Sequence, residues 1–321
     1  MMKITMEKAR ITPTINSLME RFLGDKTLLG VSPKTIETYK GKFKGLRHYL
    51  DLDAPVDKIS KADIAEMILN MKQGKRRNGE KVEPLKDVTI NSYTTALKAF
   101  FSWSKEQGYS TLFIPIYKFE QEPKDVYTQE EVLKLMKKPN LQKCSFVEYR
   151  SWVIICFLLN SGCRAATLRN VKIKDLDFDS DMILFRHMKA RNVQYVPMGN
   201  ELKRILIEYL NIRGGKADDY LFPNRNNGQL TENALRLSIE DYNHGRGVSK
   251  TSIHLFRHYF AKAYVQNGGD CFRLQKILGH KKIEMTEHYV NLYSVDTKTG
   301  FEDLSPLAVL SAQNQKITMK R

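Results

Sequence analysis

Basic and aromatic side chains in the C-terminal half of the sequence stand in short motifs whose chemistry suits a phosphate ester. They are Arg164 in SGCRAATL, Lys189 ahead of a Val-Pro pair, His254 and Arg257 in HLFRH, His280 in LGH and Tyr289 in EHYV. These motifs contain no cluster of Asp or Glu, which a two-metal nuclease needs to hold its cations. A site built from these residues would neutralise phosphate charge with Arg, Lys and His instead.

Each of these residues could contact a phosphate or transfer a proton from its position in the sequence. Arg164 follows a predicted helix break, where its guanidinium could form two hydrogen bonds with the oxygens of one phosphate. Arg257 lies three residues after His254, so on a helix both side chains project from one face. The imidazole of His254 could accept a proton or hold the phosphate. His280 follows a glycine that permits close approach, and it could donate to a phosphoryl oxygen from the start of the next helix.

Tyr289 is the candidate nucleophile. A phenol has an ordinary pKa of about 10 and is mostly protonated at neutral pH, so it needs nearby cations and a base before it can attack phosphorus. Tyr293, one helical turn further on, is its rival. Lys189 lies in a predicted hairpin turn, where its amine could reach a leaving oxygen. Three other cations of the region compete with it: Lys172, Lys174 and Arg191.

The same motifs fit a metal site or a nucleophilic serine poorly. His254 and His258 are four residues apart, as are the two zinc ligands of H-E-x-x-H. The Glu of that motif is missing, and an Arg between the histidines would repel the cation. No G-x-S-x-G sequence is present to place a serine on a sharp turn. We therefore expect neither a metal nor another cofactor.

The first third of the chain has the pattern of a four-helix bundle. Thr12-Pro13, with proline at the first helical position, and Ser32-Pro33 are predicted to start the first two helices. Ser60, with an acidic residue three positions on, opens the third as a near capping box, and the fourth spans about residues 87–107. Five cations are candidates for contact with DNA phosphates, although a solvated surface is the plainer interpretation: Lys40, Lys44, Lys75, Arg76 and Arg77.

The rest of the chain predicts a linker and a second, mostly helical domain. The helical period fades over residues 109–127, where prolines appear, and this pattern indicates an extended linker. A capping box at Thr128 opens the second domain, and a helix is predicted over 152–160. Strand-like segments at 171–178, 182–187 and 193–197 indicate a small antiparallel sheet. The predicted fold is therefore mainly α-helical, with a small antiparallel β-sheet in the second domain.

Composition points to a packed intracellular protein with a polyanionic partner. The 321 residues suggest about two domains, and 52 Lys and Arg against 36 Asp and Glu give a formal net charge of +16, which favours nucleic acid over an anionic membrane surface. No apolar run is long enough to span a bilayer and the N-terminus does not resemble a signal peptide. The four cysteines form no C-x-x-C pair, so we expect reduced thiols in a cytoplasmic protein.

The order of the chemical motifs resembles the tyrosine recombinase, or phage integrase, family. That family has G-x-R, a hairpin lysine, H-x-x-R, L-G-H and then a tyrosine nine residues after the last histidine. The matching residues here are Arg164, Lys189, His254 with Arg257, His280 and Tyr289. The resemblance covers residues 125–295, and the preceding bundle fits the family's core-binding domain. Cys163, Phe256 and Tyr259 depart from the usual residues, but none of them removes a catalytic group.

The resemblance implies a mechanism that needs no cofactor. Tyr289 would attack a scissile phosphodiester and form a 3′-phosphotyrosine, with His254 as general base. Arg164, Arg257 and His280 would neutralise the developing charge, and Lys189 would protonate the 5′-oxygen. The implied divisions are an extension over 1–11, a DNA-binding core-binding domain over 12–108, the linker, a catalytic domain over 128–297 and a tail over 298–321.

The resemblance also implies partners. These are double-stranded DNA with specific recombination sites and a homotetramer on synapsed DNA, exchanging strands through a Holliday junction. Off DNA the protein would be a monomer or weakly associated, and an accessory DNA-bending protein could take part. Four apolar residues at three-residue steps predict a short helix in the tail, which docks on a neighbouring protomer or folds back on its own core: Phe301, Leu304, Leu307 and Leu310.

Integration or excision of a mobile element is the expected role. Xer-like resolution of chromosome or plasmid dimers is the first alternative. A type IB topoisomerase would share the chemistry but relax supercoils without site preference. A DNA-binding regulator that kept the fold and lost catalysis is the last alternative, and the complete set of six catalytic positions argues against it.

Overall fold

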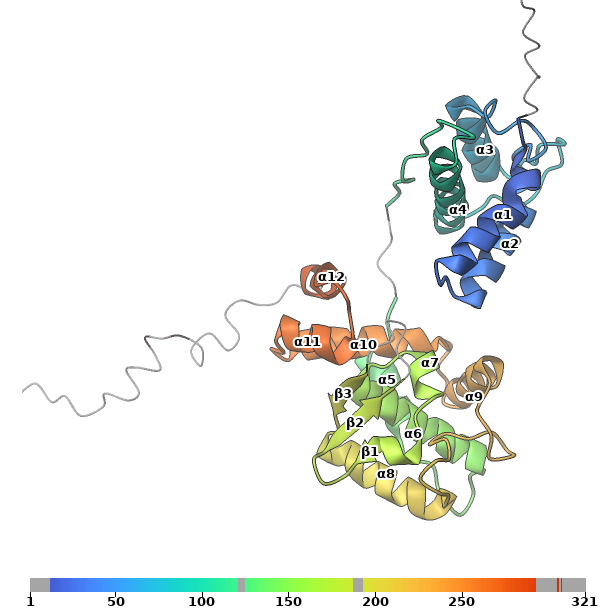
Figure 1. Cartoon of the computed structure of the whole chain (residues 1–321). Helices are drawn as coiled ribbons and strands as arrows, with labels where there is room; N and C mark the ends of the chain where they lie inside the picture. The colour runs from blue at the N-terminus through green and yellow to red at the C-terminus, as the bar shows by residue number, and fades with distance from the viewer. Residues whose placement is uncertain (1–11, 121–124, 187–192, 293–304, 306, 308–321) are drawn as a thin grey trace, which may run out of the picture. The chain divides into compact units, whose positions relative to one another are not determined.

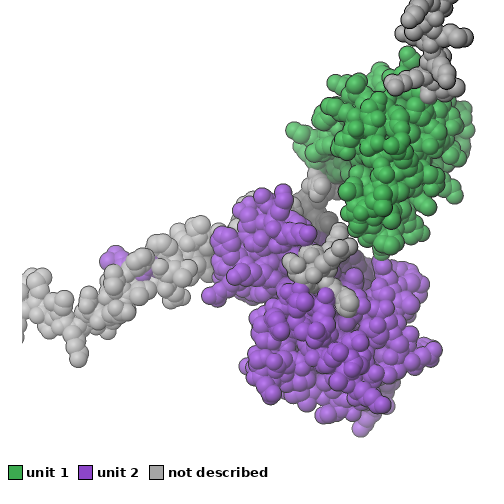
Figure 2. Space-filling view, viewed as in Figure 1, with its two compact units in different colours: residues 1–122 green, residues 123–321 purple. Residues whose placement is uncertain are grey.

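The chain divides into two compact units, residues 1–122 and 123–321, each with its own hydrophobic core (Figure 2). The computed structural model describes residues 12–120, 125–186, 193–292, 305 and 307. The architecture is mainly helical with one small antiparallel sheet, which confirms the predicted fold class. Within the described ranges, no helix combines the length and the apolar character needed to cross a bilayer.

The first unit is a bundle of four helices, α1 (Ile15–Leu28), α2 (Pro33–Leu46), α3 (Lys61–Gln73) and α4 (Asp87–Glu106) (Figure 1). Its core is aromatic. The ring of Phe22 meets Phe100 and Trp103 edge-on, each at a centroid distance of 5.5 Å, and Phe43 meets Phe100 at 5.6 Å. Edge-to-face aromatic pairs add to the apolar area that these rings bury, so they hold α1, α2 and α4 together.

Side-chain caps set where these helices start. The hydroxyl of Ser32 accepts the N–H of Thr35 ahead of α2, and Ser60 forms a capping box with Asp63 ahead of α3, both as predicted. The predicted start of α1 is wrong, because Thr14 is the capping residue and Pro13 lies outside the helix. The carbonyl of Pro13 accepts the N–H of Val56 instead, so a tertiary contact delays the first turn.

The segment predicted as a linker contains neither helix nor strand among its described residues. Its first part packs on the first unit, where Ile114 is buried and the hydroxyl of Tyr117 donates to the carboxylate of Asp87. Its last part packs on the second unit, where Tyr127 is buried and donates to the carbonyl of Lys250 at 3.1 Å. Both ends of residues 109–127 are therefore anchored in a core.

The second unit is built around one buried helix. Its helices are α5 (Gln129–Met136), α6 (Phe146–Ser161), α7 (Ala165–Leu168), α8 (Asn200–Arg213), α9 (Glu232–His244), α10 (Ile253–Gln266), α11 (Cys271–Leu278) and α12 (Glu284–Leu292). Helix α6 packs against α5, α8, α9 and α10 (Figure 1). It begins six residues before the predicted Trp152 and is capped by Ser145. Its residues are buried without a break from Tyr149 to Leu158, so no amphipathic period marks its ends.

The sheet is small and follows α7. Strands β1 (Leu176–Asp177), β2 (Met182–Phe185) and β3 (Gln194–Pro197) pair antiparallel in that order, with Phe185 opposite Gln194. The predicted strand over 171–178 is mostly wrong, since Ile173–Asp175 is a 3₁₀ turn and only two residues pair. The carboxylate of Asp175 accepts the N–H of Lys172 at 2.9 Å, which closes that turn. The predicted hairpin turn lies outside the described residues.

Candidate active site

Arg257 is the buried centre of the candidate site. It projects from α10, is 3% exposed, and donates from Nη1 to the carbonyl of Gly162 at 2.9 Å. Its Nη2 donates to the carbonyl of Leu278 at 2.9 Å and meets Nε2 of His280 at 2.8 Å. One guanidinium therefore joins the C-terminal ends of α6 and α11.

The close approach of these helix ends requires a glycine at position 162. Gly162 has φ of 56°, in the left-handed region that favours glycine. A Cβ added there would lie 2.5 Å from a ring carbon of Phe260 and 2.8 Å from a methyl of Leu278. The sequence SGCR thus ends α6, turns the chain and brings the carbonyl of Gly162 to Arg257.

His280 is neutral and its tautomer follows from its partners. A guanidinium can only donate, so Nε2 of His280 accepts from Arg257 and the ring proton lies on Nδ1. That nitrogen is 2.8 Å from Oγ1 of Thr286, which is fully buried in α12. Burial, together with the charges of Arg257 and Arg164, lowers the pKa of His280 from 6.5 to about 4. His280 follows the C-cap of α11 and does not start the next helix, so that part of the prediction is wrong.

Tyr289 docks within its own chain. It is 5% exposed and packs against α10 and α11, with Ala261, Val265, Leu274 and Leu278 around it. Its Oη lies 2.9 Å from Nδ1 of His258. Its ring is parallel to that of His280, with centroids 6.5 Å apart. The predicted nucleophile is therefore held beside the residues predicted to bind phosphate.

The two arginines bring two positive charges to the site. Burial, with the like charge of Arg164, lowers the pKa of Arg257 to about 10, so it stays cationic at neutral pH. Arg164 is partly buried at the residue before α7. Among the described residues, neither guanidinium forms an ion pair with Asp or Glu. A buried cation without a counter-charge is unfavourable, so the arrangement favours a bound anion.

Of the remaining predicted residues, some lie within the described part of the chain and others do not. His254 is exposed on α10, and its ring is 5.0 Å from that of His258, edge to face. Lys189 lies outside the described residues, as do Arg191 and Tyr293. The rival cations Lys172 and Lys174 both contact the carboxylate of Asp218.

Three residues that the sequence analysis did not assign contribute to the site. His258 was weighed only as a metal ligand, although it directly follows Arg257. Thr286 lies one helical turn before Tyr289 and contacts His280. The side-chain amide of Gln194 in β3 donates to the carbonyls of Lys276 and Ile277, which ties the sheet to α11 next to His280. Adjacency to a motif was a usable signal for His258, whereas Gln194 carried none.

The five candidate DNA contacts of the first unit differ in their surroundings. Lys40 and Lys44 are exposed one turn apart on α2, and no acidic group pairs with them in the described part of the chain. Lys75 is exposed as well. Arg76 pairs with Glu80 at 2.8 Å, and Arg77 pairs with Asp51. The two lysines of α2 therefore present the more available charge.

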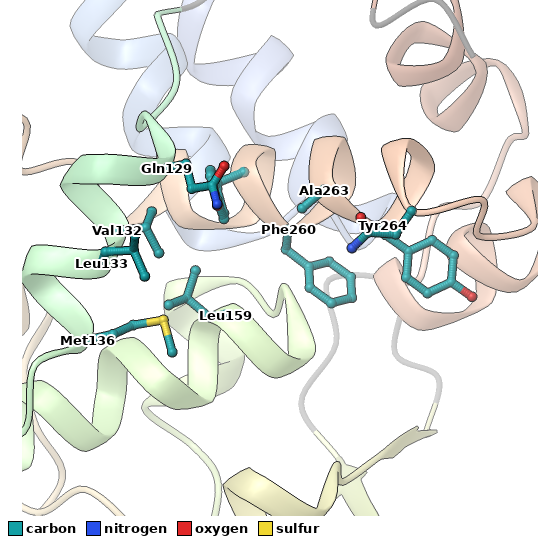
Figure 3. Close-up of a pocket in the computed structure, with 10 residues that line it drawn as sticks. Gln129, Val132, Leu133, Met136, Leu159, Phe260, Ala263 and Tyr264 are labelled. Atoms are coloured by element: carbon teal, nitrogen blue, oxygen red, sulfur yellow. The ribbon is translucent and has the colours of Figure 1, made fainter. Parts of the chain in front are cut away.

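The second unit also carries an apolar groove, whose lining residues Phe260 and Tyr264 pack against the cluster that holds Tyr289. Figure 3 shows side chains of α5, α6 and α10 along it, among them Leu133, Met136, Leu159 and Phe260. Leu133 is 61% exposed and Met136 is 42% exposed. Exposed apolar grooves of this kind are typical of interaction surfaces.

No group of three or more His, Cys, Asp or Glu that could hold a metal is found in the ranges that the structure describes.

Comparison with known proteins assigns the family. The sequence model of the phage integrase family matches residues 125–295, and that of the phage integrase N-terminal SAM-like domain matches residues 26–108. The chain belongs to the phage integrase family of tyrosine recombinases, enzymes that cleave and rejoin DNA strands.

Relatives resemble the chain over most of its length. Tyrosine recombinase XerA of Saccharolobus solfataricus is 28% identical over 293 residues, covering 90% of this chain and 93% of the relative. Tyrosine recombinase XerD of Oceanobacillus iheyensis is 26% identical over 294 residues, covering 87% and 94%.

Two solved structures share the fold. A lambda integrase tetramer bound to a Holliday junction aligns with a TM-score of 0.68 at 20% identity, covering 87% of this chain and 78% of that one. The Tn1549 transposon integrase in complex with transposon right-end DNA also has a TM-score of 0.68, at 21% identity, covering 92% and 99%.

Proposed function

We propose that the enzyme breaks one strand at a specific DNA site by attack of Tyr289 Oη on phosphorus, which forms a 3′-phosphotyrosine. The observation that carries this proposal is the docking of Tyr289 in its own chain, with its hydroxyl on an imidazole nitrogen and its ring along His280. Arg257 and His280 are directly hydrogen-bonded to each other beside it. In this proposal, the nucleophile and the phosphate site belong to one subunit.

The cations have distinct parts in this reaction. Arg257 uses three of the five N–H groups of a guanidinium within the chain, which leaves two for phosphate oxygens. Arg164 supplies the second positive charge. His254, exposed on the same helix as Arg257, contacts the phosphate from the solvent side. Fixed cations of this kind stabilise the charge that develops in phosphoryl transfer without a metal.

His280 and Lys189 complete the set. In the tautomer described above, His280 accepts from Arg257 and holds it, and it would donate to a phosphoryl oxygen only from the other tautomer. Lys189 is the proposed general acid that gives its proton to the departing 5′-oxygen. The tie between Gln194 and α11 supports this part, because it fixes one end of the hairpin close to His280. The covalent link preserves the phosphoester, so a different 5′-hydroxyl can rejoin the strand without a cofactor.

A nicked suicide duplex tests the nucleophile. Cleavage releases a short fragment with a free 5′-hydroxyl, which diffuses away. The covalent protein–DNA adduct therefore accumulates and is separated on a denaturing gel. We expect Tyr289→Phe to form no adduct, and Tyr293→Phe, the matched control, to form it at the rate of the unaltered protein. The opposite pattern would assign the nucleophile to Tyr293.

The biological role that we propose is integration or excision of a mobile element in the cytoplasm. Xer-like dimer resolution is the second candidate, favoured by similarity that covers 93% and 94% of the two Xer relatives. Plasmids that carry either the ends of a flanking element or two directly repeated chromosomal dimer sites separate the two roles. Recombination of the first set alone supports integration or excision, and recombination of the second set alone supports dimer resolution.

We propose that the protein forms a homotetramer on synapsed DNA and is a monomer or weakly associated without it. The groove of Figure 3 supports this, because it offers apolar surface to the tail over residues 298–321 of a neighbouring protomer. Deletion of this tail should abolish the tetramer on DNA, measured by sedimentation, and leave binding to a single site intact.

Recombination by the purified protein alone would show that no accessory DNA-bending protein is required.

A further inference from the structure

We propose that His258 is the base that takes the proton of Tyr289 during cleavage, an inference that rests on Tyr289 being the nucleophile. The resemblance to the family gives this role to His254. The contact in this structure is between Tyr289 Oη and Nδ1 of His258, at 2.9 Å. The two rings are tilted by 48° with centroids 5.6 Å apart. A general base must lie within hydrogen-bond reach of the proton that it removes, and His258 does.

Two other histidines are candidates for the same role: His280, whose ring lies along Tyr289, and His254, whose ring lies against His258. His280 has both ring nitrogens engaged, Nε2 by Arg257 and Nδ1 by Thr286. Its pKa of about 4 also makes it a poor proton acceptor at neutral pH. His254 is exposed in the first turn of α10, and the proposed function gives it the part of a phosphate contact.

The arrangement on α10 separates phosphate binding from proton transfer. Arg257 and His258 are adjacent, so their side chains leave the helix about 100° apart. Arg257 points to the ends of α6 and α11, and His258 points to Tyr289 on α12. One helix turn therefore presents a cation to the phosphate and an imidazole to the nucleophile.

The proposed step balances without an added reactant. The Oη–P bond forms as the P–O5′ bond breaks, so the phosphodiester is exchanged for another. The phenolic proton passes to Nδ1 of His258, which requires the neutral imidazole with its proton on Nε2. The 5′-oxygen takes its proton from Lys189, which the proposed function already assigns. Religation runs the same transfers in reverse.

Two variants separate proton transfer from hydrogen bonding. His258→Ala removes the side chain, whereas His258→Asn keeps an amide group near the position of Nδ1 but cannot take a proton. We expect both to slow single-turnover adduct formation on the suicide duplex by about 100-fold or more, the usual contribution of a general base. Measurements of thermal unfolding and of DNA binding check that each variant is folded. The exposed His244 at the end of α9 offers the control His244→Ala, which should leave the rate unchanged.

A duplex with sulfur in place of the bridging 5′-oxygen distinguishes base from acid. A thiolate leaves without a proton, so Lys189→Ala should regain cleavage on this substrate while both His258 variants stay slow. Cleavage by His258→Asn at the unaltered rate would overturn the proposal and leave His258 a hydrogen-bond partner only. Restoration of the His258 variants by the sulfur substrate would also overturn it. An adduct formed by Tyr289→Phe would instead overturn the proposed function, so the two failures are distinguishable.

Discussion

Arginines in the two units show two ways of placing a positive charge. In the first unit, Arg76 pairs with Glu80 and Arg77 with Asp51 at the surface. In the second unit, Arg257 is buried and its partners are two carbonyls and a neutral imidazole. The surface carboxylates cancel the charge of their arginines, whereas neutral acceptors fix Arg257 in place and leave its charge for a substrate.

The contrast explains why the same residue type serves different ends. Exposed ion pairs contribute little to stability and are screened by salt. A buried guanidinium held by several hydrogen bonds is fixed before any ligand binds, so a phosphate bound there would require no reorganisation at the moment of reaction. If the proposed function holds, the catalytic site depends on burial and neutral partners, whereas exposed charge supplies nonspecific affinity for DNA.

Replacing the buried arginine should produce the largest effect. Arg257→Lys keeps a positive charge but cannot reach Gly162, Leu278 and His280 together, and it leaves at least one buried carbonyl without a donor. We expect the free energy of unfolding in urea to fall by about 1–3 kcal/mol and the cleavage rate to fall by about 100- to 1,000-fold. Arg76→Lys is the matched change in the first unit and should alter stability by at most about 1 kcal/mol. Equal destabilisation at the two positions would show that burial and neutral partners do not make Arg257 more important for stability than Arg76.

The neutral state of His280 should appear as a pH dependence of stability. The unfolded chain binds this proton near pH 6.5 and the folded protein only near pH 4, so between these values the unfolded state holds more protons. Stability should therefore fall as the pH falls from about 6.5 to about 4. His280→Gln, which can still accept from Arg257, should weaken this dependence, measured by urea unfolding across that range. His244→Gln serves as the control, and an equal weakening there would contradict the assignment.

The smallest effect should come from exposed charge in the first unit. Lys40→Ala combined with Lys44→Ala should reduce the slope of log binding constant against log salt by about one for each phosphate that the lysines no longer neutralise. Fluorescence anisotropy of a labelled duplex over a salt series measures this slope. Arg76→Ala combined with Arg77→Ala should change the slope less, because Glu80 and Asp51 already neutralise these groups. A larger change for the arginine pair would show that the ion pairs open on DNA.

Local sequence signals predicted the elements that local interactions determine. Ser32 and Ser60 cap helices through bonds to residues three positions away, so their motifs predicted α2 and α3 correctly. The predicted start of α1 was wrong because the N–H of Val56 donates to the carbonyl of Pro13. This is a tertiary contact, so the local sequence does not reveal it. The predicted start of α6 was wrong because its residues are buried without a break over most of its length, so the sequence shows no amphipathic period there.

The candidate site shows the same division. The order and spacing of the motifs, through their resemblance to the tyrosine recombinase family, were enough to propose Arg257, His280 and Tyr289, which the fold then brings together. The bond between His258 and Tyr289 joins residues 31 positions apart and depends on how α12 packs on α10. The tautomer of His280 depends likewise on Arg257 and Thr286 at once. Such pairings arise from tertiary packing, so residue order alone does not reveal them.

The most direct measurement identifies the residue that becomes attached to DNA. The adduct from the suicide duplex is digested with protease and nuclease, and the peptide that retains a 3′-nucleotide is sequenced by mass spectrometry. We predict the modification on Tyr289, within the peptide that contains EHYV. Modification of any other residue, Tyr293 included, would contradict it.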